Sequence, residues 1–66
     1  MKRPRDWWEV RRARRWGSEC MTYVPFRVDA ETYARQDIAR HGNVGRIIKI
    51  DRNTRTLYYD VYEEES

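Results

Sequence analysis

Apolar and polar residues alternate in two stretches near the C-terminal end of the chain, residues 44–51 and 57–62. Both stretches are rich in β-branched and aromatic residues, which favour strands. The residues between them, 51–56, are polar turn formers. This pattern predicts a β-hairpin with a loop longer than two residues. Because a two-stranded ribbon is marginal alone, the rest of the chain must cover one of its faces.

The two-residue period of a strand also predicts which side chains share a face of this hairpin. In the first strand, Ile48 and Ile50 are expected on one face. In the second strand, the apolar face is expected to carry Leu57, Tyr59 and Val61. The opposite face of the second strand is expected to carry Tyr58, Asp60 and Tyr62.

The first half of the chain predicts a second hairpin. From Asp6 the alternation is that of a strand, with Trp8 and Val10 on one face, and Gly17-Ser18 ends it. A helix is the alternative, because Arg, Ala and Glu favour helices. Residues 21–28 predict the next strand, in which Val24, Phe26 and Val28 lie in nearby register. Pro25 cannot donate a ladder hydrogen bond, so we expect an edge position or a bulge there.

Residues 29–41 predict the helix of this chain. Ala30, Ala34 and Ile38 recur at the spacing of one helical face. Asp29 or Thr32 can serve as the N-cap, and Gly42-Asn43 supplies a C-terminal stop. The polar side chains expected to face water are Arg35, Gln36 and Arg40.

The element order is therefore strand, strand, helix, strand, strand, which predicts an α+β domain. We expect one helix packed on a mostly antiparallel four-stranded sheet. The alternative is a small SH3-like barrel with the helix as a plug. The domain is expected to span residues 6–62, between a flexible basic arm at 1–5 and an acidic tail at 63–66.

Composition narrows the cellular setting. The net charge is +3, and residues 1–16 carry seven arginine and lysine residues against two carboxylates. Cys20 is the single cysteine and cannot form an internal disulfide, which favours a reducing, cytoplasmic location. No apolar run approaches the length of a membrane span, so we expect no membrane partner.

Catalytic and metal sites have little support in the sequence. One histidine, His41, and one cysteine cannot build a Cys/His zinc site, and the three glycines are isolated. Asp51 and Asp60 could form a carboxylate pair, but a turn-forming Asp and a solvated strand Asp are the favoured interpretation. We therefore expect no catalytic residues, no metal and no cofactor.

A basic and aromatic stretch is the first candidate binding surface. Arginine donates bidentate hydrogen bonds to phosphate, and exposed aromatic rings stack on bases. The same residue types are enriched at protein-interface hot spots. A core tryptophan with a solvated arginine-rich hairpin is the alternative. The candidate residues, beside Trp8 and Trp16, are Trp7, Arg11, Arg12, Arg14 and Arg15.

The outward face of the last strand is the second candidate surface. Tyr58 and Tyr62 form an aromatic stripe there, followed by the acidic Glu63 and Glu64. If the helix covers only one face of the sheet, these tyrosines remain available to a partner. Ordinary cross-strand packing is the alternative.

The layout of the chain resembles small bacteriophage proteins. The resemblance rests on Trp-Trp-Glu-Val at 7–10, on residues 23–32, and on a short helix followed by Val-Gly-Arg-Ile-Ile-Lys-Ile at 44–50. It is similar in layout to a phage inhibitor of host RNA polymerase and in size to many anti-CRISPR proteins. The resemblance implies a stand-alone, non-enzymatic protein that docks on a host nucleic-acid machine and blocks it.

These observations lead to three hypotheses of function. The first is a non-catalytic inhibitor of a host nucleic-acid-processing complex, such as a CRISPR effector or RNA polymerase. The alternative is a direct nucleic-acid-binding module that uses an Arg/Trp hairpin. The third is an accessory protein that pairs through an edge strand. We expect a monomer or a weak dimer.

Overall fold

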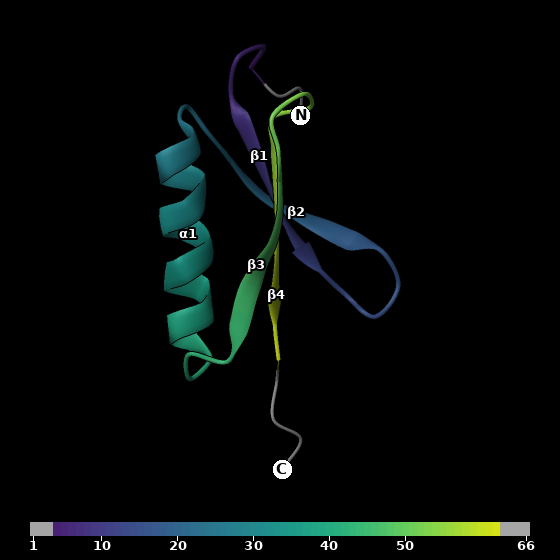
Figure 1. The fold of residues 1–66 in the computed structure, drawn as a ribbon, viewed down its shortest axis with the longest axis vertical. Coiled ribbons are helices and arrows are strands. Elements are labelled where there is room, and N and C mark those ends of the chain that lie inside the picture. The colour runs from purple at the N-terminus through teal and green to yellow at the C-terminus, as the bar shows by residue number, and fades with distance from the viewer. Residues whose placement is uncertain (1–3, 63–66) are drawn as a thin grey trace.

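The computed structural model describes residues 4–62. A single helix covers one face of a four-stranded sheet and leaves the other face uncovered (Figure 1). The elements, in chain order, are β1 (Trp8–Ala13), β2 (Ser18–Val24), α1 (Arg27–Arg40), β3 (Gly45–Asp51) and β4 (Thr56–Val61). The predicted α+β class and element order are confirmed. The barrel alternative is wrong, because the sheet is open.

The sheet consists of two antiparallel hairpins joined side by side, in the order β2-β1-β4-β3. β1 and β4 form the central pair and run parallel, with Val10 opposite Leu57 and Arg12 opposite Tyr59. Parallel neighbours need a long crossover, and β2, α1 and β3 together supply it. The chain therefore brings its first and last strands together in the middle of the sheet.

The core lies between the central strands and α1. β1 contributes Trp8 and Val10, whereas β4 contributes the three residues predicted for its apolar face. The helix contributes Ala30 and Ala34, whose small side chains let it approach the sheet closely. The buried apolar residues of the core are Trp8, Val10, Ala30, Ala34, Leu57, Tyr59 and Val61.

The predicted strand over residues 21–28 is wrong at both ends. β2 begins earlier, at Ser18, and ends at Val24, because Pro25 has no N–H to continue the ladder. Phe26 and Val28 are consequently exposed at the start of α1 rather than buried in the sheet. Phe26 is also the N-cap residue and makes no side-chain cap hydrogen bond, so the predicted caps Asp29 and Thr32 are wrong.

The C-terminal end of α1 follows the prediction. The helix ends at Arg40, and Gly42 and Asn43 both adopt positive φ, at 81° and 61°. The Asn43 N–H donates to the Ile38 carbonyl at 3.0 Å, which satisfies one of the last helical acceptors. As predicted, the helix exposes Arg35, Gln36 and Arg40. No helix among residues 4–62 is long and apolar enough to cross a membrane.

A β-bulge changes the face assignment in β3. The register with β4 shifts between Ile47 and Lys49, so one extra residue lies in this strand. Ile47 and Ile50 therefore both pack against the core, whereas Ile48 is exposed. The prediction that Ile48 and Ile50 share a face is wrong for this reason.

Candidate binding surfaces

The connection between β1 and β2 carries the most exposed tryptophan among the described residues. Its residues 14–17, here called the hairpin tip, are closed by a 2.9 Å hydrogen bond from the Arg14 N–H to the Gly17 carbonyl. Gly17 has φ of 83°, which a glycine adopts without strain. Trp16 is 87% exposed. Figure 1 shows this connection on the side of the sheet away from α1.

The four candidate arginines do not form one surface. Arg11 and Arg12 are adjacent in β1, so they point to opposite faces of the sheet. Arg12 is buried under α1, with its Nη1 3.7 Å from Asp37 Oδ2. The expectation that Arg12 belongs to an exposed patch is therefore wrong. Arg12 lies two residues after Val10 and four after Trp8, so the two-residue period of the strand puts it on the same buried face. This is the sequence signal that indicates its burial.

Arg11 lies on the uncovered face and links β1 to β2. Its Nε donates to Ser18 Oγ at 2.7 Å, and its Nη2 donates to the Ser18 carbonyl at 2.9 Å. It also forms an ion pair with Glu9, and the hydrogen bond to Glu9 raises the pKa of Arg11. These contacts occupy the guanidinium within the sheet.

Only Arg14 and Arg15 of the four accompany Trp16 at the hairpin tip. Both are exposed. Arg14 donates from Nε to Glu19 Oε1 at 2.9 Å and forms an ion pair with it. Arg15 has no side-chain hydrogen bond or ion pair to any residue within 4–62. The hairpin tip thus presents an indole ring beside two guanidinium groups.

Trp7 belongs to a different part of the surface. It precedes β1 and is 38% exposed. Seven positions of chain separate it from Arg14. At roughly 3.3 Å per strand residue, this places Trp7 about 23 Å from the hairpin tip. The structure therefore does not bring Trp7 together with Arg14 and Arg15. The tryptophan that lies beside Arg14 and Arg15 is Trp16. The Gly17-Ser18 pair that follows it is the sequence signal for a loop at this point.

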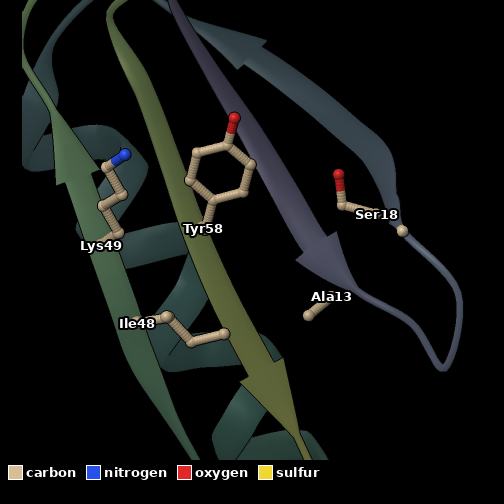
Figure 2. Close-up of a pocket in the computed structure, with 6 residues that line it drawn as sticks. Ala13, Ser18, Ile48, Lys49 and Tyr58 are labelled. Carbon is tan, nitrogen blue, oxygen red and sulfur yellow. The ribbon is translucent and has the colours of Figure 1, made fainter.

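The uncovered face of the sheet, here called the open face, contains a shallow hollow. It has a volume of about 350 Å³ and is lined by Ala13, Gly17, Ser18, Ile48, Lys49 and Tyr58. We call it the open-face hollow. Figure 2 shows the Tyr58 ring between Ile48 and Lys49 on one side and Ala13 and Ser18 on the other. The hollow therefore joins the β3 bulge to the base of the hairpin tip.

The charges of the open face cancel. Register and alternation assign the following charged residues to it: Arg11, Arg46, Lys49, Glu9, Asp51 and Asp60. Arg11 pairs with Glu9, and Lys49 Nζ lies 3.7 Å from Asp51 Oδ2. A phosphate backbone gains affinity from a surplus of cations, which this face does not offer. A protein partner has no such requirement.

The predicted tyrosine stripe is divided. Tyr58 is half-buried in the wall of the open-face hollow, as its alternation with Leu57 and Tyr59 requires. Tyr62 is 45% exposed beyond the end of β4, where its N–H donates to the Val44 carbonyl at 3.0 Å. The other two candidates of this stripe, Glu63 and Glu64, lie outside the described residues.

The sequence pattern does not predict the buried polar cluster that lies under α1. The Tyr59 hydroxyl donates to Asp37 Oδ2 at 2.5 Å. The His41 Nδ1 lies 2.9 Å from the Asp37 carbonyl oxygen and 3.6 Å from Asp37 Oδ1. Burial, reinforced by the hydrogen bond to Asp37, raises the pKa of Tyr59. Asp37 follows Ala34 by three residues on the same helical face, which is the signal that could have indicated its burial.

The two carboxylates of the second hairpin lie at its opposite ends. Asp51 pairs with Thr56, beside the turn, and Asp60 pairs with Arg46. Asp51 Oδ1 accepts hydrogen bonds from the N–H groups of Asn53 at 3.0 Å and Thr54 at 3.2 Å. These bonds, that from Thr54 foremost, lower the pKa of Asp51. The two residues therefore form no carboxylate pair.

Residues 4–62 contain no group of three or more His, Cys, Asp and Glu side chains with the geometry of a metal site. Comparison with protein-family models, with curated proteins and with solved structures gives no significant match.

Proposed function

We propose that this protein is a non-catalytic binding protein that docks on a host nucleic-acid-processing complex, such as RNA polymerase or a CRISPR effector, and blocks it. The observation that carries the proposal is the 87% exposure of Trp16 beside Arg14 and Arg15 at the hairpin tip. Leaving an indole in water forgoes a large burial free energy. Tryptophan and arginine are also the residue types that most often dominate binding energy at protein interfaces.

The neighbouring open face supports a protein as the partner. Its charges are balanced, so it lacks the cation surplus that a phosphate backbone requires. Protein interfaces combine a desolvated apolar centre with a polar rim. Trp16, the open-face hollow and the surrounding ion pairs match that arrangement.

Direct binding of nucleic acid is the second candidate, and the hairpin tip itself favours it. Arg14 and Arg15 can donate to phosphate, and the exposed Trp16 ring can stack on a base. This mode predicts an affinity that falls steeply with salt concentration, because counterions are released on binding. Binding to labelled single- and double-stranded DNA and RNA, at low and near-physiological salt, measures this dependence.

Site-specific photocrosslinking in an extract of the host cells distinguishes the two candidates. A benzophenone amino acid replaces Trp16 in one variant and Gln36, on the exposed side of α1, in the control variant. Protein crosslinks that form at position 16, exceed those at position 36 and survive nuclease treatment support the proposal. Crosslinks that disappear with nuclease support nucleic acid as the ligand. Equal labelling at both positions contradicts a role for the hairpin tip.

The blocking activity needs a separate measurement on the captured complex. Addition of the wild-type protein is expected to lower the activity of that complex in a reconstituted assay. The Trp16→Ser variant is expected to lower it far less, because it lacks the anchoring ring. An activity that is unchanged by the wild-type protein would leave a docking protein without an inhibitory function.

A further inference from the structure

We propose that two copies of this protein associate by inserting Trp16 of each copy into the open-face hollow of the other. The first observation is that Trp16 does not occupy the hollow of its own chain. Gly17 and Ser18, the next two residues, line that hollow, whereas Trp16 remains 87% exposed. The exposed Trp16 is therefore adjacent in sequence to two residues of a hollow that it does not line.

The lining of the hollow suits an indole ring. Tyr58 supplies an aromatic wall, and Ile48, which the β3 bulge leaves 47% exposed, supplies an aliphatic one (Figure 2). Aromatic rings favour stacked or edge-to-face arrangements, which add to the free energy of burial. The volume of about 350 Å³ gives room for one large side chain. The same lining would otherwise remain in contact with water.

Charge complementarity points to a second copy as the occupant. Arg15 precedes Trp16, and Asp60 follows Tyr58 by two residues on the open face of β4. Both side chains line a second hollow within one copy, yet no ion pair joins them. Neither makes a side-chain hydrogen bond or ion pair within the described part of the chain. Arg15 of one copy is free to pair with Asp60 of the other when Trp16 is inserted.

In a two-fold symmetric dimer, the insertion of Trp16 and the pairing of Arg15 with Asp60 would each occur twice. In such a dimer the same surface patch faces itself, so a ring and its receptor must lie on the same patch of each copy. The hairpin tip and the open-face hollow meet this requirement because they adjoin at Gly17 and Ser18. An unrelated partner would supply its own complementary groups, so it would not require Trp16, the hollow, Arg15 and Asp60 to lie on the same chain.

The area involved predicts a weak dimer. Each tryptophan buries about 150–250 Å². Two rings and the surfaces they cover then remain below the roughly 1,200 Å² typical of stable interfaces. The dimer is therefore expected to form at high concentration and to dissociate on dilution. The proposed dimer does not rest on the proposed docking function. Both would bury Trp16, however, so a docking partner would compete with the second copy.

Sedimentation equilibrium of the purified protein tests this inference. From low micromolar to near-millimolar concentration, the weight-average mass is expected to rise from 8.2 kDa toward twice that value. Trp16→Ser should keep the mass at that of the monomer. Trp7→Ser, at the far end of β1, is the matched control and should associate like the wild type. A monomeric wild type at every concentration, or undiminished association of Trp16→Ser, overturns the inference.

A charge exchange tests the pairing of Arg15 with Asp60. Arg15→Asp and Asp60→Arg are each expected to raise the dissociation constant about tenfold, since each places like charges opposite one another. The double variant restores the opposite charges and should recover most of the association. A double variant as weak as either single variant overturns this arrangement. Circular dichroism of each variant is the control that tests whether it is folded.

Loss of the dimer and loss of docking remain distinguishable. The mass measurement uses the pure protein alone, whereas crosslinking at position 16 uses the extract. A monomeric protein that crosslinks overturns the dimer and leaves the proposed function standing. A protein that dimerises but gives no specific crosslinks supports the dimer and overturns the proposed function.

Discussion

The hydroxyl of Tyr59, on the central strand β4, donates a 2.5 Å hydrogen bond to the carboxylate of Asp37 on α1. The same carboxylate faces the guanidinium of Arg12 on β1. One buried polar group therefore connects the helix to both strands of the parallel central pair. The apolar core holds the helix on the sheet. The contacts of Asp37 with Tyr59 and Arg12 add polar interactions of defined geometry.

Tyr59→Phe tests the hydrogen bond directly. The variant keeps the ring in the core but removes a buried donor to a charged acceptor, which is expected to cost about 1.5–3 kcal/mol of unfolding free energy. Urea unfolding at neutral pH measures the loss. Tyr58→Phe, on the half-buried opposite face, is the matched control and should lose less than half as much.

The pKa of Tyr59 also predicts alkaline destabilisation. Its folded-state pKa is raised above the unfolded value of about 10, so the unfolded chain releases this proton first. Stability from Tyr59 is therefore complete below pH 10 and decreases as the pH rises above that value. The difference in stability between wild type and Tyr59→Phe should narrow or reverse there. A constant difference from pH 8 to 11 would contradict this account.

Asp37→Ala tests the charge pair under the helix. It leaves the buried Arg12 without its carboxylate, which is expected to cost about 3–5 kcal/mol. A chain of this size has roughly 3–10 kcal/mol of total stability. The variant should therefore be partly or fully unfolded by circular dichroism at room temperature.

A paired replacement separates the cost of removing the carboxylate beside the buried Arg12 from the value of the ion pair itself. Arg12→Met combined with Asp37→Leu removes both charges and retains apolar volume, so it is expected to be more stable than Asp37→Ala. If both variants unfold alike, the cluster contributes through its hydrogen bonds rather than through compensation of charge.

Asp51→Ala is expected to lower the urea midpoint, because it removes the acceptor of the Asn53 and Thr54 N–H groups. The folded-state pKa of Asp51 is lowered, so its contribution is present above the unfolded value of about 3.9 and is lost as the pH falls further. The midpoints of wild type and Asp51→Ala should converge in acid. Asp51→Asn keeps an acceptor oxygen and should remain nearer to the wild type at neutral pH.

Gly45→Ala tests a close approach between the strands of the second hairpin. A Cβ at this position would overlap the carbonyl oxygen of Asp60 on β4, so the strands must separate locally. The expected cost is about 3 kcal/mol. Gly42→Ala is the control, because nothing lies within 4 Å of its Cβ and only the positive φ opposes it. Its cost should be about 1–2 kcal/mol, that of an L side chain in the left-handed region. Equal midpoints of thermal unfolding would contradict the steric account.

Local sequence patterns predict the order of the elements and the apolar faces of the central strands, but they misplace both ends of β2. Trp8 with Val10, and Leu57 with Tyr59 and Val61, follow a two-residue period that requires no knowledge of distant contacts. The helix and its stop at Gly42-Asn43 follow from local spacing and backbone freedom in the same way. Local periodicity is strong where one side of an element is buried.

The order of the strands, the position of the bulge and the pairing of the buried polar groups depend on contacts between distant parts of the chain. The β1–β4 pairing joins residues more than forty positions apart, so no local pattern specifies it. The bulge at Ile48 reverses one face assignment, and the buried Arg12 lies beside Asp37, which belongs to a distant part of the chain. Trp16 is the most exposed tryptophan among the described residues, because the hairpin tip lies on the side of the sheet away from α1 (Figure 1). Exposure depends on what covers a residue, and that is a property of the folded chain.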